Sequence, residues 1–420
     1  MNSILGHSLD VADNQQAART ALIEEYEPKS DVFFSSRSCT LLAKPPFANL
    51  LVENTHSIAE QARQSLRFAK ELGIVSPVVI GAINFDADKS SHLRVSSTVD
   101  KRKGHEHIDT LDESDLNPIH TDQPSLNAEP SAQQFAYNVK QALEKFAKGE
   151  LDKVVLSRTI KVQYSTPPNV HQLLKNLAVK NHHGYLFAVD LKPLNGHNKH
   201  AADFTEALKL KSKVHALVGA SPELLIAKKG NQLIAHPLAG SEPRTHIQAV
   251  DQESEARLLA SEKDHYEHAL VVKAIKAALT PFCKSLKIPD KPSVVTTPSM
   301  MHLGSLISGE LHDETTTSLE LALALHPTPA VCGYPTHSAK KAIKDLESHR
   351  RNVYAGMVGW SDEHGDGEWA VSIRCAEVED TSITVYAGAG IVNGSCPVKE
   401  TKETEAKFNT MLNAMGVAQR

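Results

Sequence analysis

The last third of the chain restricts its fold most, because it reads as consecutive strands joined by short turns. Strand-forming residues fill 353–360 (VYAGMVGW), 368–378 (EWAVSIRCAEV) and 383–390 (ITVYAGAG), and polar turns lie between them at 362–367 (DEHGDG) and 379–382 (EDTS). Connections this short join antiparallel neighbours, whereas parallel strands need long crossovers. The pattern therefore favours an antiparallel sheet over a parallel, doubly wound one.

The rest of the chain alternates blocks of helix and strand. Apolar residues at helical spacing predict helices at 57–72, 131–149, 250–279, 314–325 and 399–415. Strand-like runs lie at 77–86, 153–162, 185–191, 214–220 and 224–237, and the last of these reads as a hairpin around KKGN. We expect an α+β fold with a large, mostly antiparallel sheet core flanked by helices.

The clearest compositional break is the stretch 87–130, which is polar and rich in Asp, Ser, His and Pro. Such a composition is typical of a loop or linker. It predicts a division of the chain into an N-terminal segment, 1–130, and a main domain, 131–415.

Composition excludes several classes of protein. Lys and Arg number 45 against 50 Asp and Glu, and no basic stripe suggests nucleic-acid binding. The five cysteines are scattered without a CxxC pair, which argues against a disulfide scaffold or a structural zinc site. The chain has no run of 18 apolar residues, and its N-terminus is polar from residue 6 onward. We therefore expect no membrane span, no signal peptide and a cytoplasmic location.

Two pairs of carboxylates could carry chemistry. Asp264 and Glu267, and likewise Glu400 and Glu403, are three residues apart, so each pair shares one face of a predicted helix. If the two faces met, they would form a cage of hard oxygen ligands suited to Mg²⁺. The alternative is two solvated acidic faces, with Glu403 and Lys407 as a surface ion pair.

A lysine and a glutamate stand in apolar surroundings. Lys153 begins an apolar strand, where it could extend to solvent or could sit in a dry site and act as a base. Glu223, in GASPELLIA, could be an exposed turn residue. In an apolar environment, however, its pKa would rise and it could donate a proton.

Other features are weaker when taken singly. The glycines of PLAGS (237–241) and YAGAGIV (386–392) allow close approach of a ligand, but they match neither a Rossmann nor a P-loop fingerprint. His302 lies among apolar residues and by default is a core histidine. Arg374 is expected to share a strand face with the small residues Ala370, Ser372 and Ala376, which would leave room for an anionic ligand.

Ten segments, in order along 131–415, resemble the chorismate-utilising enzymes, which include isochorismate, salicylate, anthranilate and aminodeoxychorismate synthases. The segments are LDKVVLSR (151–158), GASPELL (219–225), PLAGSEPR (237–244), SEKDHYEH (261–268), MMHL (300–303), LALHPTPAVCG (323–333), YAGMVGW (354–360), SIRCAEV (372–378), YAGAGIV (386–392) and ETEAKF (403–408). The resemblance implies that 131–415 is a chorismate-binding catalytic domain and that 1–130 is a variable segment completing the same sheet.

The resemblance also implies roles for individual residues. Glu267 and Glu403 match direct Mg²⁺ ligands, and Asp264 and Glu400 match partners that act through water. Positions that grip or line the substrate are matched by the following residues: Arg374, Lys407, the backbone near Gly388, Ser241, His302, Ala330 and Val331. Lys153 would be the base and Glu223 the acid.

Two positions indicate which reaction is expected. Members of the family that add ammonia usually carry Gln in place of Lys153, and a glutamine cannot deprotonate water. Aminodeoxychorismate synthases typically have a lysine where this chain has Ala239. Water addition remains, and the resemblance of HPTPAVCG to isochorismate-releasing enzymes implies an isochorismate synthase of the catecholate siderophore type.

The alternatives are a salicylate synthase, which goes on to eliminate pyruvate, and a non-catalytic binder of an anionic metabolite. Chorismate is the expected substrate. We expect a monomer with no nucleic-acid or membrane partner. A transient contact with an enzyme that consumes isochorismate is also expected.

Overall fold

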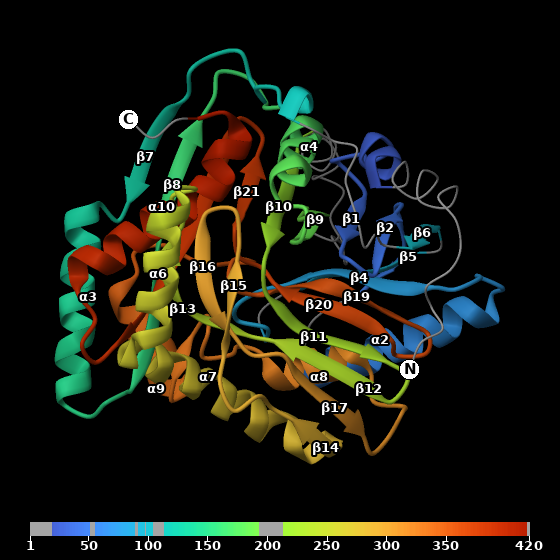
Figure 1. Cartoon of the computed structure of the whole chain (residues 1–420). Coiled ribbons are helices and arrows are strands. Elements are labelled where there is room, and N and C mark those ends of the chain that lie inside the picture. Colours follow the sequence, from blue (N-terminus) through green and yellow to red (C-terminus); the bar gives the residue numbers. More distant parts are fainter. Residues whose placement is uncertain are drawn as a thin grey trace.

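The computed structural model describes residues 19–50, 55–88, 91–96, 98–103, 113–192 and 213–417. Two large sheets and one small sheet, all with antiparallel pairing, form the framework (Figure 1). The first sheet runs in the order β18 (Gly333–Tyr334), β8 (Lys153–Gln163), β22 (Ser382–Val392), β21 (Cys375–Glu379), β10 (His215–Ser221), β9 (Tyr185–Asp190), β1 (Val32–Ser35), β2 (Cys39–Ala43) and β6 (Val99–Lys103), and β7 (Ser125–Glu129) also pairs with β8.

The second sheet runs in the order β14 (Cys283–Lys287), β17 (Ile307–Leu311), β12 (Gln232–His236), β11 (Leu224–Lys229), β20 (Gly367–Val371), β19 (Met357–Asp362), β4 (Val78–Ile83), β5 (Ser91–Ser96) and β3 (Pro46–Asn49). The small sheet contains β13 (Leu238–Pro243), β16 (Met300–Gly304) and β15 (Ser293–Thr296). The predicted α+β class with an antiparallel core is confirmed, although the core is built from two large sheets.

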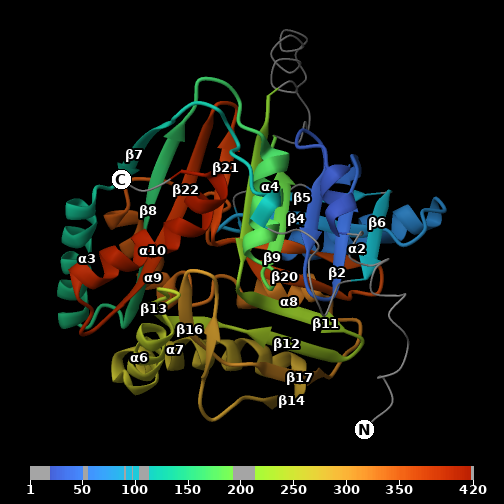
Figure 2. The same ribbon diagram turned by 45° about the horizontal axis from the view of Figure 1, so that its top comes forward.

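Helices cover the sheets on their outer sides. On the first sheet, α10 (Pro397–Met415) packs on β22 and on the helices α3 (Ala132–Ala147) and α4 (Val170–Lys180), as Figure 2 shows. On the second sheet, α8 (Ser318–Leu325) packs on β11 and β20, and α2 (Thr55–Glu71) packs on β4 and β5. Around the small sheet lie α6 (Gln248–Ala260) and α7 (Glu262–Leu279), and α9 (Thr336–Leu346) packs on β8.

The first sheet is buried on both faces. In β10, Leu217 belongs to the core cluster shared with the second sheet, whereas its neighbour Val218 belongs to the cluster under α4 and α10. Successive residues of a strand point to opposite faces, so a sheet buried on both sides reads as a continuous apolar run. This explains why β8, β9 and β10 carry runs of Val, Leu and Ala.

Among the places where the chain crosses between the two large sheets, two lie next to each other. The first crossing joins β10 to β11 through Pro222 and Glu223, and the second joins β20 to β21 through residues 372–374. The two crossings are hydrogen-bonded to each other, because Val371 N donates to Glu223 O over 3.1 Å and Ala220 N donates to Arg374 O over 3.1 Å. Side chains at these crossings lie where the two sheets separate.

The prediction of one strand at 368–378 is therefore wrong. Arg374 has a φ of 51°, in the left-handed region, and lies between β20 and β21. It does not share a strand face with Ala370, Ser372 and Ala376, since β20 and β21 belong to different sheets. Local alternation cannot reveal such a change of sheet.

The prediction of a loop at 87–130 is also wrong, because β5, β6 and β7 lie within it. Strand β5 pairs with both β3 and β4. Its Arg94 is buried and donates to Ser30 O over 2.6 Å and to Asp190 O over 3.0 Å. A polar sequence forms a strand here because distant partners satisfy its polar groups. The parts of this stretch at 89–90, 97 and 104–112 lie outside the described residues, as does the polar N-terminus, 1–18.

The helix predicted at 250–279 is two helices. Ser261 has extended backbone angles and caps α7, and its Oγ accepts from Asp264 N over 3.2 Å. The helix predicted from Glu314 begins later, at Ser318, because Thr317 and Glu320 form a capping box. Within the described residues, no helix is both long and apolar enough to cross a membrane.

Candidate active site

A small cavity of about 60 Å³ lies where β22, the small sheet, α10 and both crossings meet. Most of the predicted site residues line it: Glu223, Ser241, Glu267, His302, Ala330, Val331, Arg374, Gly388, Glu403 and Lys407. Lys153, Asp264 and Glu400 do not line the cavity, but Lys153 contacts Glu267, and Asp264 and Glu400 share their helices with Glu267 and Glu403, which do line it. Segments far apart in sequence are therefore brought to one place.

Lys153 is fully buried, so the alternative in which its side chain reaches solvent is wrong. Its Nζ lies 3.0 Å from Glu267 Oε1, which places a cation from the first residue of β8 against a carboxylate of α7. Gly390 of β22 makes room for this pair, because a Cβ there would lie 2.1 Å from Glu267 Oε1.

Glu223 is 3% exposed and is therefore not a turn residue in solvent. Leu238 N donates to its Oε1 over 3.4 Å. Burial raises the pKa of Glu223 to about 7, although this backbone donor and the positive charges of Lys153 and Lys407 oppose the rise. The carboxyl can thus hold a proton near neutral pH.

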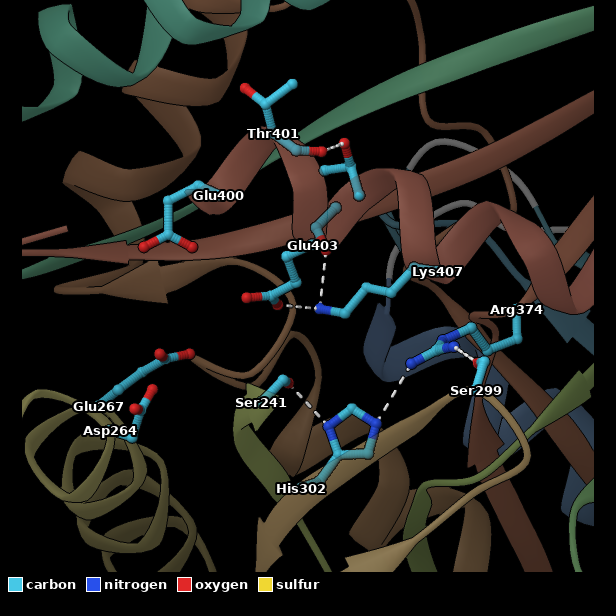
Figure 3. A network of polar contacts seen from close by, with 12 residues as sticks. Ser241, Asp264, Glu267, Ser299, His302, Arg374, Glu400, Thr401, Glu403 and Lys407 are labelled. Carbon is cyan, nitrogen blue, oxygen red and sulfur yellow. Dashed lines mark hydrogen bonds and ion pairs between the residues drawn. The ribbon is translucent and has the colours of Figure 1, made fainter. Parts of the chain in front are cut away.

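Each of the four predicted metal-binding carboxylates forms an ion pair with a lysine. Figure 3 shows Asp264 and Glu267 on α7 facing Glu400 and Glu403 on α10. Lys263 Nζ lies 2.9 Å from Glu400 Oε1 and 3.7 Å from Asp264 Oδ1. Lys407 Nζ lies 2.5 Å from Glu403 Oε1 and donates to Gly388 O over 2.9 Å. The acidic faces meet each other and are not two solvated surfaces.

The pKa values of these carboxyls reflect burial and crowding. Burial raises the pKa of Asp264 and of Glu400, and the nearby Glu403 adds to the rise at Glu400. Burial also acts to raise the pKa of Glu267, but Lys153 and Lys263 outweigh it and lower the pKa overall. Burial acts to lower the pKa of Lys263, but the surrounding carboxylates raise it overall. The lysines supply the positive charge that the cluster needs.

The opposite wall of the cavity carries a hydrogen-bonded chain from Arg374 to Ser241 (Figure 3). Arg374 donates to Ser299 Oγ over 3.1 Å and to Thr410 Oγ1 over 3.2 Å, and its Nη2 lies 3.2 Å from His302 Nε2. Burial and Arg374 lower the pKa of His302 well below its usual value, so the ring is neutral. A guanidinium can only donate, so Nε2 accepts and the ring proton is on Nδ1. There it donates to Ser241 Oγ over 2.8 Å, which leaves the Ser241 hydroxyl hydrogen available to a ligand.

Residues 78–416 match the family model described as "Chorismate binding enzyme". The chain belongs to this family. Among curated relatives, isochorismate synthase DhbC of Bacillus subtilis is 42% identical over 94% of this chain and 96% of its own length. The vibriobactin-specific isochorismate synthase of Vibrio cholerae is 37% identical over 94% of each chain.

A solved structure agrees with this family. The putative 2,3-dihydroxybenzoate-specific isochorismate synthase of Bacillus anthracis is 41% identical and superposes with a TM-score of 0.85, covering 95% of this chain and all of that chain. The resemblance and the fold predicted from the ten segments are confirmed.

The donor set of this chorismate-binding enzyme fits Mg²⁺. Four carboxylates from two facing helices are hard oxygen ligands, and two of them, Asp264 and Glu400, have pKa values raised by burial. Among the residues that the structure describes, no three acidic, histidine or cysteine side chains yet converge closely enough to hold a metal. Each of the four carboxylates instead forms an ion pair with a lysine.

Two functional candidates escaped the sequence reasoning. Lys263 adjoins Asp264 in SEKDHYEH and could have been suspected from its place beside an acidic pair. Tyr354 lines the cavity and stacks on Tyr386 with ring centroids 4.9 Å apart. Nothing in the local sequence distinguishes Tyr354 from an ordinary core tyrosine.

Proposed function

We propose that this chain is an isochorismate synthase that converts chorismate to isochorismate with Mg²⁺ and feeds the synthesis of 2,3-dihydroxybenzoate for a catecholate siderophore. The observation that carries the proposal is a buried, readily protonated glutamate that lines the cavity, together with a buried lysine in contact with Glu267 of the same cavity. These are the two proton-transfer groups that exchange of a hydroxyl requires. The names of the relatives support the substrate and the product.

The reaction needs a base on one side of the ring and an acid on the other. Lys153, as the free amine, takes a proton from water while the water oxygen bonds to C2. The ring double bonds shift, the C4–O bond breaks, and Glu223 protonates the departing hydroxyl, which leaves as water. For this step the lone pair of the Lys153 amine must face the water, while an N–H of the same amine can keep its contact with Glu267. The pKa of about 7 keeps a large share of Glu223 protonated near neutral pH.

The remaining side chains of the cavity fix the substrate. Arg374 and Lys407 are cations suited to the enolpyruvyl carboxylate, and Ser241 presents a hydroxyl hydrogen set free by His302. Ala330, Val331 and the backbone at Gly388 form apolar and backbone walls. Bound in this way, the ring carbons would lie between the base and the acid.

Glu267 and Glu403 would hold Mg²⁺ directly, with Asp264 and Glu400 acting through water. The ion would supply positive charge to the ring carboxylate of the substrate. Lys263 neutralises the carboxylates when no metal is bound, so it must move or share its partners when a cation arrives. Lys263 therefore competes with the metal.

Incubation of the purified protein with chorismate and Mg²⁺, followed by chromatography, tests the proposal. Isochorismate as the sole product is expected. Salicylate with pyruvate would favour the alternative synthase, and absence of turnover would favour a binding protein. Because Glu403 is a proposed ligand, Glu403→Ala should abolish the response to Mg²⁺. An unchanged metal response would remove Glu403 from the ligand set.

Three further predictions accompany this function. We propose a cytoplasmic location, a monomeric state and a transient contact with the enzyme that consumes isochorismate. The division into a segment 1–130 and a catalytic domain 131–415 is likewise proposed, with strands of the first segment contributing to both large sheets.

A further inference from the structure

A second and larger cavity, of about 490 Å³, adjoins the candidate active site. It lies between the turn joining β1 to β2, the residues that connect α4 to β9, the turn of the β15–β16 hairpin and α10 (Figure 1). The two cavities share Pro222 and Arg374. Arg374 therefore stands at the boundary between them.

The lining of this outer cavity is strongly basic. Its permanent cations are Arg37, Lys180, Arg244 and Arg374. Four histidines also line the cavity: His182, His183, His236 and His246. Among the described residues that line the cavity, none is acidic. Outside the lining, Asp251 Oδ2 lies 3.5 Å from Arg244 Nε, and the charges of Glu403 and Glu368 act on Arg374 and Tyr185. The cavity thus has a positive potential suited to an anion.

Apolar surfaces complement these charges. Val295, Ala220, Pro222 and Pro298 face the same space, and Tyr185 contributes an aromatic ring. A basic lining with apolar walls fits a small organic anion with a ring better than it fits an inorganic ion. The volume falls in the range usual for small-molecule sites.

The inner cavity is too narrow to admit a ten-carbon dicarboxylate without movement of side chains. Its volume is about 60 Å³, against about 490 Å³ for the outer cavity. The guanidinium of Arg374 is held between the two by Ser299, Thr410 and His302. An anion in the outer cavity can reach Arg374 before the inner site has opened.

We propose that the basic cavity is an outer binding site for a ring-containing dicarboxylate. The dicarboxylate docks there and then moves past Arg374 into the inner site. With the function proposed above, that dicarboxylate is chorismate, so the inference rests on that function. The outer cavity therefore sets how fast the anion is captured and leaves the chemical step unaffected.

Capture by charge has a measurable signature. A basic funnel raises the association rate of an anion, and salt screens this effect within a Debye length. Removal of a cation from the funnel should lower the association rate and kcat/KM at low ionic strength. The value of kcat should not change, because the residue touches no reacting atom.

Arg37→Glu is the test variant, because Arg37 is exposed and lines only the outer of these two cavities. Arg350→Glu is the matched control, with the same charge change at an exposed arginine that lines a different cavity, formed by residues 84–88 and 337–352. Stopped-flow measurement gives the association rate constant for chorismate, and steady-state kinetics give kcat and kcat/KM. Thermal midpoints verify that both variants are folded.

We expect Arg37→Glu to lower the association rate constant on the order of tenfold at 20 mM salt, with kcat unchanged and with little effect from Arg350→Glu. The difference should disappear near 0.5 M salt. Equal association rates in the two variants would overturn the inference. An effect on kcat alone would also overturn it and would indicate a regulatory site. Absence of turnover in the wild type would count against the proposed function, whereas the association rate would still decide the role of the cavity.

Discussion

Glu223→Gln provides a quantitative test of the environment assigned to the proposed acid. The substitution keeps the size of the side chain and removes its ability to donate a proton as a carboxyl group. We expect isochorismate formation to be lost while chorismate binding remains measurable. In the wild type, kcat/KM should fall as the pH rises above about 7, because Glu223 then loses its proton in the free enzyme.

The same raised pKa makes a prediction about stability. The pKa of Glu223 rises from 4.5 to about 7 on folding, so the folded state binds this proton more tightly than the unfolded state does. The resulting stabilisation is complete below pH 4.5 and is lost as the pH rises through 7. At 1.36 kcal/mol per pH unit, the full loss is about 3 kcal/mol, and most of it falls between pH 5 and pH 8.

Glutamine carries no such penalty at any pH. The free energy of unfolding of Glu223→Gln, relative to the wild type, should therefore increase by roughly 2 to 3 kcal/mol between pH 5 and pH 8. Urea denaturation at a series of pH values measures this difference, and titrations common to both proteins cancel in it. The exposed Glu255 on α6 provides the control, since Glu255→Gln should give a difference that does not vary with pH. Parallel stability curves for Glu223→Gln and the wild type would refute the argument that burial raises this pKa.

The remaining predictions concern the cations of the site. Lys153→Ala should abolish turnover in the chromatographic assay. The substitution leaves the buried Glu267 without its partner, so it should also destabilise the metal-free protein by about 3 kcal/mol in urea titrations. Activity in both Lys153→Ala and Glu223→Gln would reject the pair as base and acid. Lys263→Gln should lower the Kd for Mg²⁺ on the order of tenfold in calorimetry, since it removes the competing charge, whereas Lys276→Gln on the exposed side of α7 should leave the Kd unchanged. A Lys263→Gln variant that merely loses stability, with the wild-type Kd, would show that Lys263 is structural. Arg374→Gln should raise KM at least tenfold, and a KM equal to that of the wild type would exclude a grip on the substrate carboxylate.

Local sequence determined the elements whose signals are short-range. Hairpins such as β11–β12 follow from the alternation of residues on both sides of a tight turn, and they fixed the antiparallel character of the sheets. The spacing of Asp264 and Glu267 placed both carboxylates on one helical face, and burial then followed from the packing of α7. Lys153 was recognised because the segments around it match the family in the same order along the chain. Members of the family that add ammonia usually carry Gln at this position, so the lysine pointed to water as the nucleophile.

The tertiary structure decided the features that depend on contacts between segments far apart in sequence. Strand β5 is polar, yet it is ordered because Arg94 finds acceptors on residues 30 and 190, which a local pattern cannot reveal. The change of sheet at Arg374, between β20 and β21, likewise depends on two sheets that separate at that point.

The same reason accounts for the charges of the site. The sequence predicted acids that could hold a metal, but only packing paired them with Lys153, Lys263 and Lys407. The basic outer cavity is also invisible in the composition, since its cations come from segments spread between residues 37 and 374. Local spacing specifies which side chains share a face, whereas electrostatic partners are set by the approach of chain segments far apart in sequence.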